Sequence, residues 1–180
     1  LTPSFDLAVL KKLFGRMASG VITDDEVAIN LSVYSIHDPE LLDWLVNAMQ
    51  ADTVLSQRLV FEFTELGLVQ DRVGVEKFVT MMRKLGAKFA VDNFGLHHSA
   101  FEYLQQLKPR YLKLSPAYIR DLRNNQKQQF FISSVVKITR PLEIRVIALG
   151  VEDVETLELL GDLGVDGYQG YITGNISDLG

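Results

Sequence analysis

The sequence contains no cysteine, so it offers neither a disulfide framework nor a thiolate site, which agrees with a reducing compartment. Long apolar runs are also missing, because stretches such as Val146–Val151 fall far short of the roughly 20 residues that span a bilayer. No basic segment followed by an apolar stretch opens the chain, and we therefore expect no signal peptide.

Basic residues are not in excess. The 180 residues include 18 Lys or Arg and 23 Asp or Glu, which gives a formal net charge of −5 at pH 7. Phosphate contacts need clustered Lys and Arg, so direct nucleic-acid binding is disfavoured. The balance leaves room for a small anionic ligand in one pocket and for a local basic patch at Arg120, Arg123 and Lys127.

The motifs of several common enzyme classes are absent too. No G-x-G-x-x-G turn follows the first predicted strand, and the chain has no P-loop, nucleophile elbow or Cys/His zinc spacing. What remains is a chain with 47% hydrophobic residues and a length that fits one domain. It starts at Leu1 with helical sequence almost at once, and we interpret it as part of a longer protein.

Strand-like and helix-like segments alternate along the chain. Apolar residues at helical spacing begin after Asp38, which is a good N-cap and is followed by Pro39. A later helical stretch ends at Gly86, which would supply its C-terminal cap. Alternation of this kind predicts a parallel sheet, either an open doubly wound sheet or a (β/α)8 barrel of about 250 residues, of which the chain would be three quarters. The pattern favours the barrel slightly. The predicted strands are Val27–Asn30, Leu59–Phe63, Lys88–Asp92, Arg110–Lys113, Ile144–Ala148 and Gly167–Tyr171.

Most of these strands carry a polar residue at or near the carboxyl end, where a barrel places its active site. Asn30, Glu62 and Asp92 offer the hard oxygen atoms that suit Mg²⁺, Mn²⁺ or Ca²⁺. Lys113 would neutralise a phosphate or hold a water molecule, which together describes a phosphoester site. The alternative is structural, since a single Asp or Asn after a strand usually forms a turn. The complete set is Asn30, Glu62, Glu65, Asp92, Asn93, Lys113 and Gln169.

Other candidates carry less weight. His97 and His98 are adjacent, so their side chains diverge and a shared metal ion is not expected. His37 precedes a helix cap and is expected to be solvated, whereas Met81 and Met82 lie in a helical pattern typical of core packing.

At these same residues the sequence resembles the EAL-domain family, bacterial modules that hydrolyse or bind cyclic di-GMP. The family's motifs recur in order over essentially the whole chain, on six consecutive predicted strands. They are N-L-S at Asn30–Ser32, E-F-T-E at Glu62–Glu65, D-N-F-G at Asp92–Gly95, K-L-S at Lys113–Ser115, A-L-G-V-E at Ala148–Glu152 and Q-G-Y at Gln169–Tyr171.

The resemblance implies a modified (β/α)8 barrel, in which residues 1–180 are a partial EAL domain. The first strand, the first helix and the second strand, which carries the E-A-L motif, would precede Leu1. The resemblance also implies roles for individual residues. Asn30, Glu62 and Asp92 match metal ligands, and Asn30 and Asp92 also match positions that contact the nucleotide. Lys113 matches the lysine that holds the catalytic water, and Gln169 matches a glutamine near the metal ions and the ligand. Glu65 matches the glutamate that holds the loop after the D-D-F-G strand.

The chain departs from the family where charge matters most. Asn93 stands where active members have a second metal-binding aspartate, and Leu149 replaces the acid of A-E-G-V-E. Two lost carboxylates should weaken the second ion of a two-metal site, and activation of water depends on that ion. Ser115 replaces the K-I-D aspartate, and this loss of a third carboxylate also argues against hydrolysis. We expect weak Mg²⁺ or Mn²⁺ binding, no organic cofactor, a vestigial Lys113 and little or no hydrolysis.

Degenerate members of the family follow two routes. Some bind cyclic di-GMP without turnover, and others, of the CsrD/MshH type, act through partners such as the glucose-specific phosphotransferase component in controlling small-RNA decay. The stretches Leu112–Leu122 and Asn124–Val136 look closer to the second type. We therefore expect a regulatory module with cyclic di-GMP or protein partners, and an active phosphodiesterase is the alternative. The resemblance further implies that the domain forms a homodimer and lies in the cytoplasm. A cytoplasmic domain is also compatible with a protein that is anchored in the inner membrane.

Overall fold

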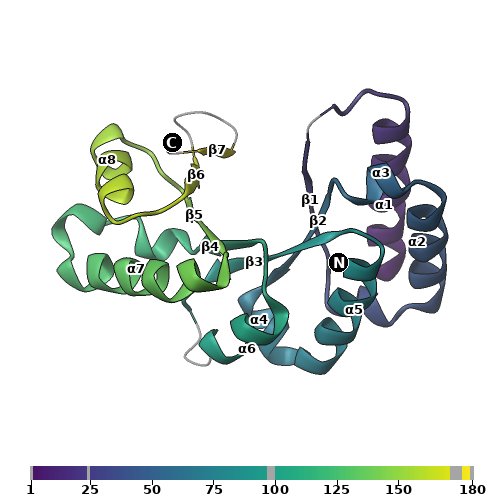
Figure 1. Cartoon of the computed structure of the whole chain (residues 1–180), viewed down its shortest axis with the longest axis horizontal. Helices are drawn as coiled ribbons and strands as arrows, with labels where there is room; N and C mark the ends of the chain where they lie inside the picture. The colour runs from purple at the N-terminus through teal and green to yellow at the C-terminus, as the bar shows by residue number, and fades with distance from the viewer. Residues whose placement is uncertain (1, 24, 97–99, 171–175, 179–180) are drawn as a thin grey trace. The chain divides into compact units, whose positions relative to one another are not determined.

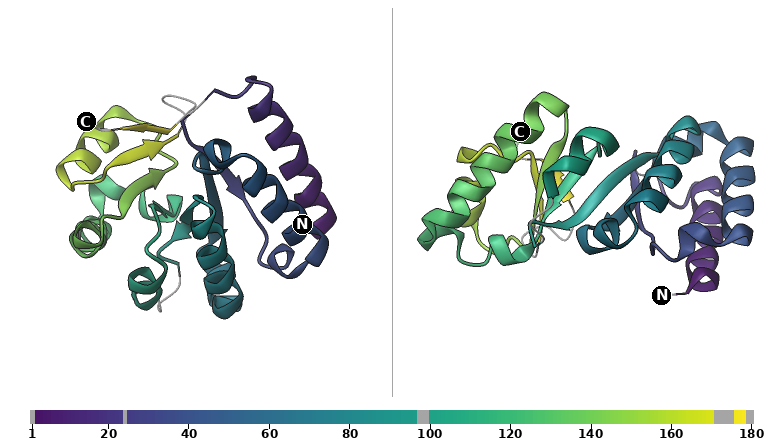
Figure 2. Two further views of the ribbon diagram at one scale, coloured as in Figure 1. Left: turned by 45° about the vertical axis from the view of Figure 1, so that its right-hand side comes forward. Right: turned by 90° about the horizontal axis from the view of Figure 1, so that it is seen from below.

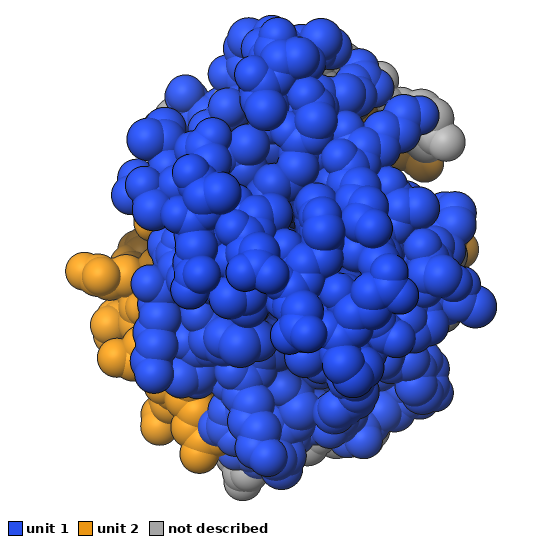
Figure 3. All heavy atoms as spheres, turned by 90° about the vertical axis from the view of Figure 1, so that its right-hand side faces the viewer, with its two compact units in different colours: residues 1–89 blue, residues 90–180 orange. Residues whose placement is uncertain are grey.

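The computed structural model describes residues 2–23, 25–96, 100–170 and 176–178. The chain divides into two compact units, residues 1–89 and 90–180, which are called unit 1 and unit 2 (Figure 3). Within the described ranges, no helix has both the length and the apolar character needed to cross a membrane.

Unit 1 is built on two parallel strands, β1 and β2, with Val27 opposite Leu59 and Asn30 opposite Glu62. Helices α1 and α2 pack side by side next to this pair (Figure 1). The elements in chain order are α1 (Pro3–Ala18), β1 (Val27–Asn30), the 3-10 turn η1 (Ser35–His37), α2 (Pro39–Ala51), α3 (Thr53–Ser56), β2 (Leu59–Thr64), α4 (Glu65–Gln70) and α5 (Arg72–Lys84).

Aromatic side chains fill the core of unit 1. Phe78 of α5 packs edge to face against Phe61 and Phe63 of β2, with ring centroids 5.3 and 5.6 Å apart. Phe89 lies 5.8 Å from Phe63. All of β2 except Thr64 is buried, and its residues apart from Glu62 and Thr64 are apolar, since a parallel strand covered on both faces does not alternate.

The predicted helix boundaries in unit 1 are confirmed. Asp38 caps α2 by accepting a hydrogen bond from the backbone of Leu41 at 2.9 Å, and Pro39 occupies the first helical position. Gly86 follows α5 with a φ of 97°, a backbone conformation that glycine adopts without steric cost and that ends the helix.

Unit 2 continues from β3 with four parallel strands in the order β3-β4-β5-β6 and an antiparallel β7 beside β6. Helices α7 and α8 lie on one side of β4 to β6 (Figure 2). The elements are β3 (Lys88–Phe94), α6 (Ala100–Leu107), β4 (Tyr111–Leu114), the 3-10 turns η2 (Pro116–Tyr118) and η3 (Leu122–Asn124), α7 (Gln126–Thr139), η4 (Arg140–Leu142), β5 (Arg145–Leu149), α8 (Val154–Asp162), β6 (Gly167–Gln169) and β7 (Ile176–Asp178).

Within each unit, neighbouring parallel strands follow chain order, as in a (β/α)8 barrel, whereas a doubly wound sheet reverses its order at a switch point. The predicted fold class, a portion of a (β/α)8 barrel, is confirmed. Helices α3, α4 and α6, strand β7 and the 3-10 turns were not among the predicted elements. Strand β3 runs to Phe94, two residues beyond its predicted end at Asp92.

Candidate functional site

Unit 1 brings together two of the predicted metal ligands. Asn30, the last residue of β1, is the register partner of Glu62 on β2, so the two side chains leave the sheet on the same face. Asn30 is exposed, whereas Glu62 is only 4% exposed. The backbone of Leu31 donates to the carbonyl of Glu62 at 3.0 Å and keeps the chain after Asn30 against β2.

A carboxylate that the sequence did not single out holds the loop after Asn30. Asp6 of α1 is 4% exposed, and its Oδ2 accepts hydrogen bonds from Ser35 Oγ at 2.6 Å and from the Ser32 backbone at 3.2 Å. Ser35 is itself fully buried. The available signal was an acid within the apolar pattern of the first helix. Asp6 therefore connects α1 to the N-L-S segment.

Glu65 begins α4 and is 1% exposed. Thr64 caps this short helix by accepting from the Gly67 backbone at 3.1 Å. A side chain at Gly67 would meet Val33 Cγ1 at 2.8 Å, so α4 packs tightly on the segment that follows the N-L-S motif. The predicted role of Glu65 in holding the loop after β3 stays a prediction.

Unit 2 places Asp92, Asn93 and Lys113 at a bulge between β3 and β4. Val91 pairs with Leu112 and Phe94 pairs with Leu114, so two residues of β3 face the single Lys113. Asn93 adopts a φ of 54°, and its Nδ2 donates a hydrogen bond to Asp92 Oδ2 at 2.9 Å. Lys113 is 5% exposed. The bulge re-aims the polar pair and places it beside a buried ammonium group.

Ser115, which stands where the family has the K-I-D aspartate, has a structural part in unit 2. It is 3% exposed, and its backbone donates to the Phe94 carbonyl at 3.0 Å. Its hydroxyl accepts a long bond of 3.4 Å from the Ala117 backbone at the start of η2. Ser115 therefore ties the end of β3 to η2.

Leu149 and Gln169 are register partners on β5 and β6. Gln169 is exposed and Leu149 is half-buried. The Gln169 carbonyl accepts from the Gly150 backbone at 2.7 Å, and a Cβ on Gly170 would lie 2.0 Å from the Val151 carbonyl oxygen. The turn after β5 therefore closes directly onto β6, with an apolar side chain beside Gln169.

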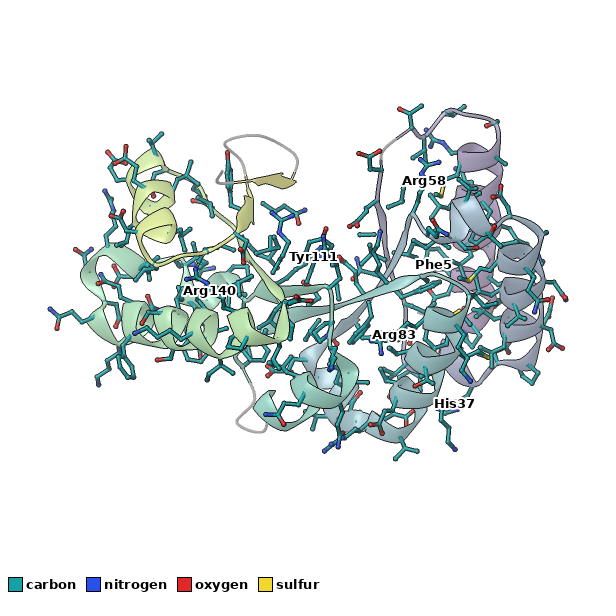
Figure 4. The ribbon with its side chains drawn as sticks, in the orientation of Figure 1. Phe5, His37, Arg58, Arg83, Tyr111 and Arg140 are labelled. Atoms are coloured by element: carbon teal, nitrogen blue, oxygen red, sulfur yellow. The ribbon has the colours of Figure 1, made fainter. Side chains whose placement is uncertain are left out.

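The weaker candidates have different outcomes. The side chain of His37 is 60% exposed, as predicted (Figure 4). It also makes a 2.5 Å contact with Asp71 Oδ2. Hydrogen bonding from His37 holds the pKa of Asp71 below its usual value. Met82 is buried and Met81 is half-buried. The predictions for His97 and His98 lie outside the described residues.

The candidate metal positions keep few carboxylates. At the candidate positions, carboxylates remain at Glu62, Glu65 and Asp92, and one oxygen of Asp92 already accepts from the Asn93 amide. Among the residues that the structure describes, no three His, Cys, Asp or Glu side chains gather closely enough to hold a metal ion. Binding of a single dication stays a prediction.

Comparison with known proteins identifies relatives of the whole chain. The family model described as "EAL domain" matches residues 1–175. The chain is 30% identical over 176 residues to the cyclic di-GMP phosphodiesterase PdeB of Shewanella oneidensis, covering 97% of this chain and 21% of that protein. It therefore spans about a fifth of the length of this relative.

Two solved structures share the fold. BlrP1 of Klebsiella pneumoniae, in a complex with manganese and cyclic di-GMP, superimposes with a TM-score of 0.86 and 27% identity, covering 97% of this chain and 45% of that chain. The LapD S helix-GGDEF-EAL protein of Vibrio cholerae, bound to cyclic di-GMP, gives a TM-score of 0.86 and 28% identity, covering 94% and 41%.

Proposed function

Because the chain belongs to the EAL-domain family, we propose that it is a catalytically degenerate EAL domain that serves as the regulatory module of a larger signalling protein. It would act through cyclic di-GMP, through protein partners, or through both. The observation that carries the proposal is the Asn93–Asp92 hydrogen bond, which occupies the place where active members of the family have two neighbouring acids.

The argument against hydrolysis is electrostatic. Two dications held close together repel each other, and a cluster of carboxylates offsets that repulsion. Asn93 and Leu149 each remove one negative charge from positions that match acids in active members. Asn93 also directs its Nδ2–H at Asp92, which leaves only its neutral Oδ1 as a possible cation ligand. We infer that Asn30, Glu62 and Asp92 would hold at most one weakly bound Mg²⁺ or Mn²⁺.

The relatives support cyclic di-GMP as the ligand. They include a phosphodiesterase of this nucleotide and structures bound to it. The residues that match ligand positions here are Asn30, Asp92 and Gln169, and Asn30 and Gln169 are exposed, as contacts to a ligand require. A receptor needs contacts to the nucleotide but no pair of metal ions, and these three residues are the contacts that this chain keeps.

Action through a partner is supported by the likeness of Leu112–Leu122 and Asn124–Val136 to CsrD-type members. The second of these stretches forms most of α7 and carries Phe130, whose side chain is 75% exposed. A large aromatic group in water is suited to a protein interface. A phosphotransferase component is the partner that this likeness suggests, and a homodimer is compatible with it.

An active phosphodiesterase is the second candidate, and Lys113 favours it. Lysine is seldom buried, yet Lys113 is 5% exposed and lies opposite Asp92 and Asn93. This is the arrangement expected of a lysine that holds the attacking water.

The deciding experiment combines calorimetry and an activity assay on the full-length protein. We expect micromolar binding of cyclic di-GMP with Mg²⁺ or Ca²⁺ and no linear dinucleotide with Mn²⁺. Turnover would overturn the degenerate assignment in favour of the enzyme. Absence of both binding and turnover would overturn the receptor route and leave action through partners alone.

A further inference from the structure

The turn that ends β3 has an unusual backbone. Asn93 and Gly95 have φ values of 54° and 108°, so the chain enters the left-handed region twice within three residues. Residues other than glycine seldom adopt this backbone conformation, and the conformation persists only where surrounding contacts fix it. Contacts to this turn come from the segment Ser115–Tyr118 and from Phe131 of α7.

Two consecutive carbonyls of the turn are held by Ser115–Tyr118. The Ser115 backbone donates to the Phe94 carbonyl at 3.0 Å, and the Tyr118 hydroxyl donates to the Gly95 carbonyl at 2.6 Å. The first bond uses backbone that every residue except proline has. The second depends on a hydroxyl group, which phenylalanine would lack.

Aromatic rings close the turn from the same side. The Tyr118 ring stacks on Phe131 of α7 with centroids 4.2 Å apart, and Phe131 stacks on Phe94 at 6.5 Å. A Cβ on Gly95 would lie 2.6 Å from Tyr118 Cε2 and 3.0 Å from Phe131 Cζ. The turn therefore packs directly against the two rings, and the Gly95 carbonyl oxygen lies within hydrogen-bond distance of the Tyr118 hydroxyl.

We propose that Tyr118 is a positioning residue whose hydroxyl fixes the Asp92–Gly95 turn and thereby the orientation of the Asn93 amide toward Asp92. The rings pack against the turn without fixing a direction, whereas the hydroxyl adds a directional bond to the Gly95 carbonyl. With the Phe94 and Gly95 carbonyls both held, the backbone that directly follows Asn93 is restricted, and with it the direction of the Asn93 amide. The proposal rests on the proposed function only in its effect on ligand affinity.

The test is Tyr118→Phe in the full-length protein, because this variant keeps the ring and removes one oxygen atom. Loss of a hydrogen bond of ordinary strength should speed hydrogen exchange at Phe94–Leu96 and at Ser115 by about three- to tenfold. The side-chain amide resonances of Asn93 should shift, and the dissociation constant for cyclic di-GMP with Ca²⁺ should rise by about the same factor. Tyr34→Phe, which removes an exposed hydroxyl in unit 1, is the control and should change none of these.

The outcomes separate this proposal from the proposed function. Faster exchange confined to the turn, with shifted Asn93 amide signals and weaker ligand binding, supports positioning. Unchanged exchange and signals, or acceleration spread evenly over both units, overturns it. If the unaltered protein does not bind cyclic di-GMP, the receptor function fails, and the exchange and Asn93 signals still decide the role of Tyr118.

Discussion

The side-chain amide of Asn93 donates a hydrogen bond to Oδ2 of Asp92 at 2.9 Å, so two neighbouring residues of β3 stabilise each other where two carboxylates would repel. The pair lies at a bulge opposite the buried Lys113. The hydrogen bond therefore takes the place of a cation in offsetting repulsion between the two side chains.

Restoring the two acids should increase metal affinity. Asn93→Asp together with Leu149→Glu adds two carboxylates, and we expect Mn²⁺ to bind about tenfold more tightly or better by calorimetry, since ligand charge tunes cation affinity. Without metal, Asn93→Asp should lower the free energy of unfolding by about 1 kcal/mol because the hydrogen bond is lost. Asn47→Asp, on exposed surface of α2, is the charge control. Unchanged Mn²⁺ affinity in the double variant would show that these positions are wrongly assigned.

Asp6 should contribute strongly to the stability of the N-L-S loop. Asp6→Ala leaves the fully buried Ser35 hydroxyl without its partner, and an unsatisfied buried group costs about 1–3 kcal/mol. Urea unfolding measures the loss, with Asp43→Ala as the control at an exposed position. The double variant Asp6→Ala/Ser35→Ala should lose less than the sum of the two single variants. Strict additivity would contradict a direct interaction.

Gly170 should tolerate no side chain. Its Cβ would lie 2.0 Å from the Val151 carbonyl oxygen, so Gly170→Ala forces the turn after β5 away from β6. We expect a loss of about 3 kcal/mol or more in the free energy of unfolding, at the upper end for an overpacked site. Gly161→Ala is the matched control, because a Cβ there meets nothing within 4 Å and the position lies in α8. Alanine should stabilise that helix by about 0.5–1 kcal/mol. Equal effects of the two substitutions would contradict the packing argument.

Asp71 should make the free energy of unfolding depend on pH in the acid range. Hydrogen bonds from His37 and from the Gly74 backbone lower the pKa of Asp71 in the folded state. Its contribution is therefore present above the unfolded pKa of about 3.9 and is lost as the pH falls through the lower folded pKa. Asp71→Asn keeps a cap for the Gly74 N–H and removes the charge that faces His37, so it should cost about 0.5–1 kcal/mol at pH 7. Thermal unfolding should show the difference in stability between the two proteins narrowing below about pH 4. A difference that is constant from pH 7 to pH 3 would rule this mechanism out.

Local signals were sufficient for much of the secondary structure. Asp38 and Pro39 predict the start of α2, and Gly86 predicts the end of α5, because caps and left-handed glycines act over a few residues. The short α4 was missed since its sequence, Glu65–Gln70, contains Gly67 and follows a strand directly, and the packing of Gly67 on Val33 is a tertiary contact. Strand β7 was missed for the related reason that three residues carry too little pattern.

The sequence by itself determined the fold class, the family, and the candidate positions at the strand ends, because alternation of strands and helices and short ordered motifs are local properties. Tertiary structure alone decided how those positions are held. Asp6 reaches Ser32 and Ser35 from another element, and the Tyr118 hydroxyl reaches Gly95 across 23 residues. Contacts of this kind join residues far apart in the chain, and no periodicity or motif spacing encodes a distance between them.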